Sequence, residues 1–147
     1  QGRTGGAGMS ARSLVSGTAS GPVLTLDDPL SFWGGFDSAS GRAIDRFHPQ
    51  HGTCLSGTVL CMQRGRGSSS GASVLAEAIR LGTAPAAIIL LDEDAIIATG
   101  ALVAQMLYGI DCAVVAIRDE AEWHRLASLP RLAIEAGAEA VVITPLA

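Results

Sequence analysis

Apolar residues recur along the chain with two different periods, and the two periods alternate from residue 58 onward. Short continuous apolar runs, typical of strands buried on both faces of a parallel sheet, occupy residues 58–62, 86–92, 112–117 and 139–144. Between them, segments with the spacing of amphipathic helices occupy residues 72–81, which end at Gly82, and residues 101–108 and 120–126. Strands that alternate with helices predict right-handed crossover connections and therefore an α/β fold.

The first third of the chain has a different composition. Residues 10–58 are rich in Gly, Ser, Asp and Pro and contain only short apolar segments such as residues 22–26, so they predict short strands and loops. We expect this part to add an antiparallel or barrel-like layer, which makes residues 9–147 a single β/β/α domain. Residues 1–8 lack the apolar core of a signal peptide and precede Met9, so we interpret them as an expression tag or a disordered N-terminus.

The composition indicates one globular domain and excludes several classes of function. The chain has 147 residues, of which 48% are hydrophobic and 16% charged, and it contains no run of like charges, which argues against disorder and a nucleic-acid tail. Its net charge of -4 disfavours a polyanionic partner. All 10 basic residues are arginine, which excludes a lysine Schiff base and the lysine of a phosphate-binding loop.

The apolar stretches and the cysteines indicate the cellular location of the protein. The longest apolar stretches, such as residues 84–91, are far shorter than the ~20 residues of a membrane-spanning helix, so we expect no membrane association. Three cysteines, Cys54, Cys61 and Cys112, form no CxxC pair. Their odd number favours small buried side chains in a reducing cytoplasm over a disulfide framework.

The segment QRGRGSSSGAS at residues 63–73 links a predicted strand to a predicted helix and contains three consecutive serines. As a simple connection, its glycines permit a turn and Ser70 caps the helix, which leaves Ser68 and Ser69 without a role. As a proton-transfer site, Ser68 lies at a helix N-terminus, where backbone N–H groups and the helix dipole stabilise an alkoxide or an anionic ligand. Arg64 and Arg66 can then add positive charge and bind a carboxylate.

Two other interpretations of this segment remain open from the residues alone. A dinucleotide-binding loop would use Asp92 at the end of the next strand, but its third glycine falls one residue late. A hydrolase nucleophile turn of the form G-x-S-x-G would centre on Ser69, with Asp111 and His124 completing a triad in that chain order.

Two longer stretches resemble a known family. The segment PLSFWGGFDSASGRAIDRFHPQHGTCLSGTVLCMQRGRGSSSGASVLAEAIRLGTAPAAIIL at residues 29–90, with IIATGALVA at residues 96–104, resembles the small subunit, or swivel domain, of the aconitase X family. GRGSSS is also similar to the G-x-G-S-S-R loop of true aconitases, whose first serine is the catalytic base. The resemblance implies the fold of the aconitase swivel domain, with Ser68 as the catalytic base. It implies supporting roles for Gly67, Ser69, Ser70 and Arg66.

The resemblance also implies an activity and a partner. True aconitases have an arginine at the position of Ser70 that grips a substrate carboxylate, so this chain departs from citrate-type chemistry. The family dehydrates cis-3-hydroxy-L-proline in bacteria and mevalonate 5-phosphate in archaea, and the three serines favour the hydroxyproline enzyme. The resemblance places an iron–sulfur centre, which removes the hydroxyl as a Lewis acid, on a separate large subunit, with no metal on this chain. We therefore expect a hydro-lyase that is active only with that subunit, or else a non-catalytic assembly or regulatory subunit.

Several polar and aromatic residues outside the serine segment are weaker candidates. Asp37, Asp45 and His48 lie in the family-like segment and are expected either at the subunit interface, along the substrate's path, or in loop-stabilising hydrogen bonds. Trp33 and Phe36, beside paired glycines, are expected either in an apolar docking patch or in the core.

Overall fold

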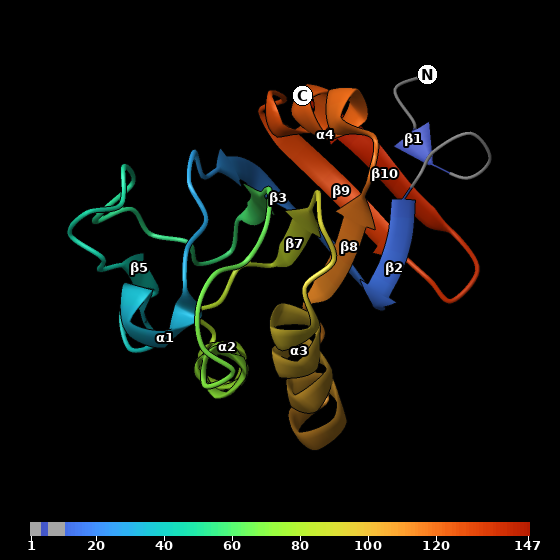
Figure 1. Ribbon diagram of the computed structural model, residues 1–147. Coiled ribbons are helices and arrows are strands. Elements are labelled where there is room, and N and C mark those ends of the chain that lie inside the picture. Colours follow the sequence, from blue (N-terminus) through green and yellow to red (C-terminus); the bar gives the residue numbers. More distant parts are fainter. Residues whose placement is uncertain (1–3, 6–10) are drawn as a thin grey trace.

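The computed structural model describes residues 4–5 and 11–147 and shows a curled, mixed sheet with helices on both faces (Figure 1). The eight strands lie in the order β1-β10-β9-β3-β6-β7-β8-β2. Their bounds are β1 Thr4–Gly5, β2 Ala11–Val15, β3 Gly17–Thr25, β6 Val59–Met62, β7 Ala87–Leu90, β8 Ala113–Ile117, β9 Arg131–Ala136 and β10 Val141–Leu146. The remaining elements are the helices α1 Phe32–Gly35, α2 Gly71–Leu81, α3 Ala95–Tyr108 and α4 Glu120–Ala127, and the small ribbon of β4 Phe36–Asp37 and β5 Arg42–Ala43.

β3 joins two kinds of sheet. Its first part pairs antiparallel with β9, from Gly17 opposite Ala136 to Pro22 opposite Arg131. Its last residues pair parallel with β6, which continues through parallel pairing to β7 and β8. The predicted parallel α/β core and the predicted antiparallel layer are therefore both present, and one strand belongs to both.

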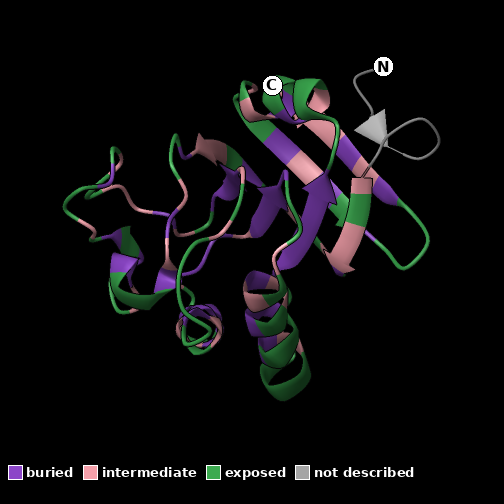
Figure 2. Cartoon of the chain, viewed as in Figure 1, coloured by how far each residue is buried: buried purple, intermediate pink, exposed green. Residues whose placement is uncertain are grey.

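The central strands are buried on both faces, as their continuous apolar runs predict. Leu60 and Met62 of β6 belong to the core cluster beneath α2 and α3, whereas Val59 and Cys61 belong to the cluster beneath α4. This alternation follows the two-residue period of a strand, and all four side chains have 0% exposure. Figure 2 shows these strands as the most continuously buried part of the molecule.

The helix after β7 is longer than the sequence pattern predicts. The predicted helix at residues 101–108 follows Gly100, which we took for a boundary, but α3 begins at Ala95 and Gly100 lies inside it. A Cβ at Gly100 would lie 2.7 Å from the backbone oxygen of Ala72 and 3.1 Å from Cβ of Leu75. Glycine is therefore needed where α2 crosses α3 closely, and the residue marks a helix contact instead of a helix end.

The C-terminal strands also differ from the prediction. The last strand covers Val141–Leu146, slightly later than the predicted residues 139–144, and its partner β9 was not predicted at all. β9 alternates buried and exposed residues, and its short length left little signal after Pro130. The other predicted strands and the helices α2 and α4 are confirmed.

Two predictions concern the ends of the molecule and the membrane. The predicted tag or disordered segment at residues 1–8 lies outside the described residues, apart from Thr4–Gly5, whose backbone pairs with β10. In the part of the chain that the structure describes, no helix is long and apolar enough to cross a membrane.

Candidate active site

The serine segment lies where two parallel strands end. It follows the carboxyl end of β6 and leads into α2, while residues 91–94 follow the carboxyl end of β7 and lead into α3. The backbone N–H groups of Leu91 and Asp92 both donate to the backbone oxygen of Gln63, which ties the two connections together. Ligands of open α/β sheets bind at such carboxyl ends, so the location agrees with a functional loop.

Two glycines let the serine segment fit between its neighbours. Gly67 has a φ of 97°, and a Cβ there would collide with the side chain of Ser31. A Cβ at Gly65 would collide with the carboxylate of Asp94 and lie 2.9 Å from Cδ1 of Ile97. Segments from far apart in the chain thus contact the loop from both sides, and only glycine permits that approach.

Ser68, and not Ser70, supplies the side chain that caps α2. Ser70 precedes the first residue of α2 but has helical backbone angles and makes no side-chain capping hydrogen bond, so the expected cap is wrong. The hydroxyl oxygen of Ser68 instead accepts a hydrogen bond from the backbone N–H of Ser70 at 3.1 Å, and the backbone oxygen of Ser68 accepts from Gly71 at 2.9 Å. The effective start of the helical turn is therefore Ser68.

This geometry has an electrostatic consequence for Ser68. Its oxygen faces a backbone N–H at the N-terminus of an 11-residue helix, where the helix dipole favours negative charge. Both influences stabilise a serine alkoxide relative to the neutral hydroxyl. Ser68 and the neighbouring Ser69 and Ser70 are all exposed, so a substrate can reach them.

The two arginines upstream differ in their contacts. Arg64 Nε lies 2.9 Å from a carboxylate oxygen of Asp92, and both side chains are about half exposed. Among the described residues, Arg66 has no hydrogen-bond or ion-pair partner. Arg66 is therefore the guanidinium available to a ligand, whereas Arg64 already has a counterion.

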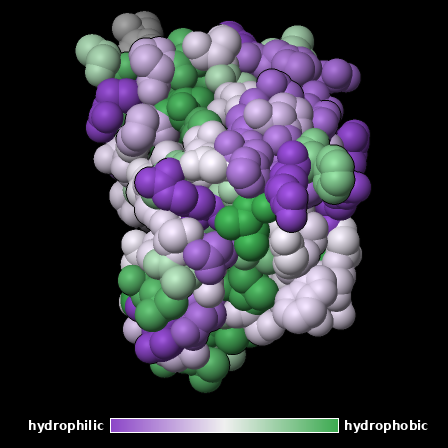
Figure 3. Space-filling model, turned by 90° about the vertical axis from the view of Figure 1, so that its left-hand side faces the viewer, coloured by the Kyte–Doolittle hydropathy of each residue, from purple (hydrophilic) through white to green (hydrophobic). Residues whose placement is uncertain are grey.

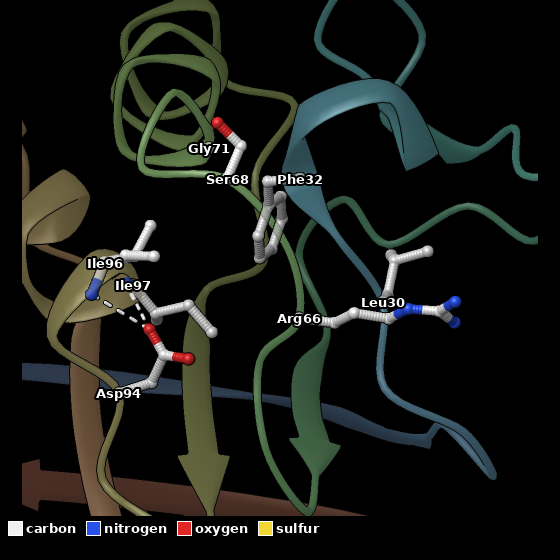
Figure 4. Close-up of a pocket in the computed structure, with 8 residues that line it drawn as sticks. All are labelled: Leu30, Phe32, Arg66, Ser68, Gly71, Asp94, Ile96 and Ile97. Atoms are coloured by element: carbon white, nitrogen blue, oxygen red, sulfur yellow. Dashed lines mark hydrogen bonds between the residues drawn. The ribbon is translucent and has the colours of Figure 1, made fainter.

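A narrow pocket opens beside Ser68. It has room for about one water molecule. In Figure 4 the ring of Phe32 lies in the middle of the group, while the Ser68 hydroxyl and the Arg66 guanidinium point in different directions. The polar groups do not converge on one point within this chain. The residues that line it are Leu30, Phe32, Arg66, Ser68, Gly71, Asp94, Ile96 and Ile97.

Asp94 and Ser31 are parts of this site that the sequence analysis missed. The carboxylate of Asp94 accepts the N–H groups of Ile96 and Ile97, both at 2.9 Å, and so caps α3. An Asp placed two residues before an apolar helical segment is the signal that could have revealed it. Ser31 gave no signal, because its contact with Gly67 depends on the tertiary fold.

The weaker polar candidates make loop-stabilising hydrogen bonds and do not line the Ser68 pocket. Asp37 accepts N–H groups of Ala39 and Ser40, and bonding by the Ser40 side chain, then by the Ala39 backbone, lowers the pKa of Asp37 below its ordinary value. Asp45 accepts the N–H of Phe47 at 2.9 Å. A role for either carboxylate at an interface stays a prediction.

His48 is buried and fully engaged. Its Nε2 donates to the backbone oxygen of Asp28 at 2.8 Å, and its Nδ1 accepts the N–H of Gln50 at 3.0 Å, which requires the tautomer protonated at Nε2. With 5% exposure, His48 holds the loop before β6 in place and has no free nitrogen for a ligand.

The aromatic pair separates into one exposed and one core residue. Trp33 is 57% exposed, whereas Phe36 is 4% exposed and packs edge-on against Phe32 with ring centroids 5.2 Å apart. Trp33 lies next to the pocket, because its backbone N–H is 3.5 Å from the position of a Cβ at Gly71.

The alternative interpretations of the serine segment find no support in the contacts. His124 pairs with Glu120 on exposed α4, and Asp111 accepts from Gln105, so neither reaches Ser69 as a triad would require. Asp92, the candidate ribose ligand of a dinucleotide site, pairs with Arg64.

The cysteines do not fit an iron–sulfur cluster. Burial raises the pKa of Cys61 and that of Cys112 to about 12, which opposes the thiolate form that binds iron. The two belong to different core clusters on opposite faces of the sheet. Among residues 4–5 and 11–147, no group of three His, Cys, Asp or Glu side chains is arranged to hold a metal ion. A cluster on the large subunit stays a prediction.

The fold and the glycine-flanked serine turn define a class of protein: a mixed α/β domain that presents one wall of an active site at the carboxyl ends of its parallel strands. Comparison with known proteins identifies the family. The model of the aconitase X swivel domain matches residues 8–143, and the chain belongs to that family.

Named relatives agree with the family assignment. The chain is 45% identical over 122 residues to the cis-3-hydroxy-L-proline dehydratase of Pseudomonas aeruginosa, a match that covers 79% of this chain and 21% of that protein. It is 46% identical over 96 residues to the phosphomevalonate dehydratase small subunit of Methanothermobacter thermautotrophicus, covering 65% of this chain and 73% of the relative. The chain thus spans about a fifth of the bacterial relative and most of the archaeal one.

A solved structure has the same fold. The crystal structure of aconitase X from Thermococcus kodakaraensis in its holo-form superposes with a TM-score of 0.75 at 29% identity, covering 92% of this chain and 96% of that one. The predicted swivel-domain architecture is therefore confirmed.

Proposed function

We propose that this chain is the swivel subunit of a hydro-lyase and that Ser68 accepts the proton that the reaction removes from the substrate. One observation supports the role of Ser68 above the others. Its exposed hydroxyl oxygen accepts the Ser70 N–H at 3.1 Å at the N-terminus of α2, which is the environment that a serine base needs.

The proton transfer follows from this arrangement. In cis-3-hydroxy-L-proline, the bond between Cα and its hydrogen breaks, the proton moves to the alkoxide Oγ of Ser68, and the electron pair forms a carbon–carbon double bond as the bond to the 3-hydroxyl breaks. The hydroxyl departs as hydroxide and becomes water by taking up the proton that Ser68 then releases, which restores the alkoxide. The enamine product then tautomerises to Δ1-pyrroline-2-carboxylate. We assign the departure of the hydroxyl to no residue of this chain, because its cysteines and carboxylates do not fit the cluster that the family implies.

The charges beside the serine turn favour a substrate with one carboxylate. Arg66 is exposed and has no ion-pair partner among the described residues, so it can bind that carboxylate, whereas Asp94 is engaged in capping α3. Mevalonate 5-phosphate has a phosphate and a carboxylate, and such a ligand is better served by several free cations. Arg64 does not provide one, because Asp92 neutralises it.

The second candidate substrate remains mevalonate 5-phosphate. It is favoured by the archaeal relative, whose identity to this chain equals that of the bacterial relative within one percentage point. In either case we propose that catalysis requires a large subunit or a covalently joined equivalent, because the polar groups of this chain form only one wall of a site.

The test is a dehydration assay with this chain and the aconitase X large subunit of the same organism, mixed under anaerobic conditions. Ser68→Ala is expected to lower kcat for cis-3-hydroxy-L-proline by ~10²-fold or more, the usual contribution of a general base. Ser128→Ala is the matched control and is expected to retain activity. Ser128 is exposed, follows α4 on the other face of the sheet, and its hydroxyl donates to the backbone oxygen of Arg125.

Each other outcome selects a different conclusion. Activity that survives Ser68→Ala shows a non-catalytic assembly or regulatory subunit. Turnover of mevalonate 5-phosphate without turnover of hydroxyproline selects the second candidate substrate and retains Ser68 as the base if the variant is inactive there.

A further inference from the structure

The outer surface of α3 is unusually apolar for a helix exposed to water. Residues 95–110 contain no charged side chain, and the helix is exposed along its second half (Figure 2). Met106 is 75% exposed and Leu107 is 69% exposed. We name this surface the α3 ridge; its exposed apolar residues are Leu102, Val103, Met106, Leu107, Tyr108 and Ile110.

A groove connects the α3 ridge with the serine turn. It has a volume of about 460 Å³ and runs between α2 and α3. Ser69 lies among its lining residues, next to the proposed base, while Val103 and Tyr108 belong to the α3 ridge. Ala72, Ser73, Ala76 and Glu77 form its α2 side, where the small side chains leave space and the Glu77 carboxylate is paired with Arg80. The apolar surface is therefore continuous with the loop that must face a partner.

Helix α4, on the other face of the sheet, differs from α3 in its exposed side. Its exposed side is charged, and Glu122 and Arg125 form an ion pair of 2.7 Å on it. A contiguous exposed apolar surface on a soluble domain marks an interaction site more often than chance exposure. Figure 3 views the molecule from the side of α1 and β5 and shows hydrophobic residues at the surface in both its upper and its lower half.

The lengths of the relatives indicate what covers this surface. In the Pseudomonas protein the matched segment is 21% of one polypeptide, so four fifths of that dehydratase lie outside it. In the Methanothermobacter protein the matched segment is most of a separate small subunit. A domain that occurs both fused and separate needs one surface that faces the large remainder in both arrangements.

We propose that the α3 ridge and its groove are the surface on which this domain docks against the large subunit, through an uncharged apolar surface of that partner. The inference rests on the proposed function, since it takes the partner to be the rest of the dehydratase. Docking there places the partner beside Ser69 and closes the open side of the serine turn. Burial of the α3 ridge then excludes water from the site at the same time as it holds the subunits together.

The experiment measures binding of this chain to the large subunit of the same organism, supplied as a separate polypeptide, by isothermal titration calorimetry. Met106→Glu and Leu107→Glu each place a charge in the centre of the α3 ridge and are expected to raise Kd by ~10-fold or more, since a buried unpaired charge opposes association. Ala121→Glu adds the same charge to exposed α4 and is expected to change Kd less than about twofold. Melting temperatures confirm that all three variants fold.

Hydrogen exchange gives a second measurement that needs no variant. Addition of the large subunit is expected to slow amide exchange in residues 95–110, while residues 120–127 of α4 stay unchanged. Ser68→Ala is expected to bind normally, so a Ser68→Ala complex that forms and keeps full activity contradicts the proposed chemistry without contradicting the docking surface.

Four results would overturn the inference. The first is unchanged Kd for both α3 variants, the second is slowed exchange confined to other segments, and the third is no binding by the unmodified chain. The fourth is self-association of the chain that the α3 variants abolish while they leave partner binding intact, because the ridge would then be covered by a second copy.

Discussion

The two tryptophans of this chain lie in regions with opposite character. Trp123 of α4 is 2% exposed, belongs to the core cluster shared with β9 and β10, and donates its indole N–H to the backbone oxygen of Ile89 at 3.3 Å. Trp33, beside the serine turn, is 57% exposed. The α4 region is complete in itself, with a buried core and a charged exterior. The region around α2 and α3 has an equally buried core, but its exposed surface includes the apolar α3 ridge.

Truncation of the two tryptophans should give the largest difference between these regions. Trp123→Ala is expected to lower the free energy of unfolding by about 3–5 kcal/mol, the usual cost of removing a large core side chain. Trp33→Ala is expected to change it by less than about 0.5 kcal/mol, because the side chain is mostly solvated. Urea denaturation followed by circular dichroism measures both. Similar costs for the two variants would contradict the division into a complete and an incomplete region.

Two glycines with positive φ test the crowding around the serine turn. Gly67→Ala is expected to destabilise the protein by about 1–3 kcal/mol, because the new Cβ meets Ser31 in addition to the backbone strain. Gly34→Ala has the same strain at a φ of 83° but nothing within 4 Å of its Cβ, so it is the matched control and should cost about 1 kcal/mol. The difference between their urea midpoints measures the contact with Ser31. Equal midpoints would show that Ser31 moves freely away.

Alanine variants of the two helix-capping residues, Asp94 and Asp119, compare the two regions by their effects on stability and on KM. Each side chain caps its helix, α3 or α4, so alanine at either position is expected to cost about 1 kcal/mol of stability. Only Asp94 lines the Ser68 pocket, so Asp94→Ala should also raise KM for the substrate in the assembled enzyme, by a few-fold. Steady-state kinetics with both variants separates the effects. An equal rise in KM for Asp119→Ala would show that the change acts through stability alone.

The smallest expected effect concerns a single thiol in the loop before β6. Hydrogen bonding by Ser56 lowers the pKa of Cys54 below its ordinary value, whereas burial raises the pKa of Cys61 and Cys112 to about 12. At pH 8 the native protein should therefore react with one equivalent of a maleimide, at Cys54, and the rate should rise with pH until its thiol is fully ionised. Mass spectrometry counts the labels, and denatured protein should accept three. Labelling of Cys61 in native protein would reveal opening of β6.

The sequence predicted those parts of the fold that depend on local periodicity. The buried parallel strands and the helices α2 and α4 follow from apolar runs and helical spacing within single segments. β9 escaped prediction because its buried residues Leu132, Ile134 and Ala136 alternate with exposed or partly exposed ones, whereas the predicted strands have continuous apolar runs. The length of α3 escaped because Gly100 is required by a helix crossing that only the tertiary structure contains.

Only those residues of the candidate site that belong to the family's loop motif could be predicted from the sequence. Ser68, Gly67 and Arg66 lie together, as the loop motif implied, and Ser68 has the N–H donor that a helix N-terminus supplies. The position of Asp94 and Ser31 on either side of the loop depends on contacts between distant segments, for which no local pattern exists. The sequence made His48 a candidate for the subunit interface or the substrate's path, but both of its ring nitrogens are hydrogen-bonded to backbone groups.

The shared strand β3 has a consequence for how the protein forms during synthesis. Its antiparallel partner β9 (Arg131–Ala136) is synthesised long after β3 (Gly17–Thr25). Until β9 emerges, the backbone groups of residues 17–22 lack their strand partner, and such an edge attracts other nascent chains. We expect the nascent chain to depend on chaperones until β9 arrives, and folding in vitro to be slow for a domain of this size because so many strand pairs join distant segments.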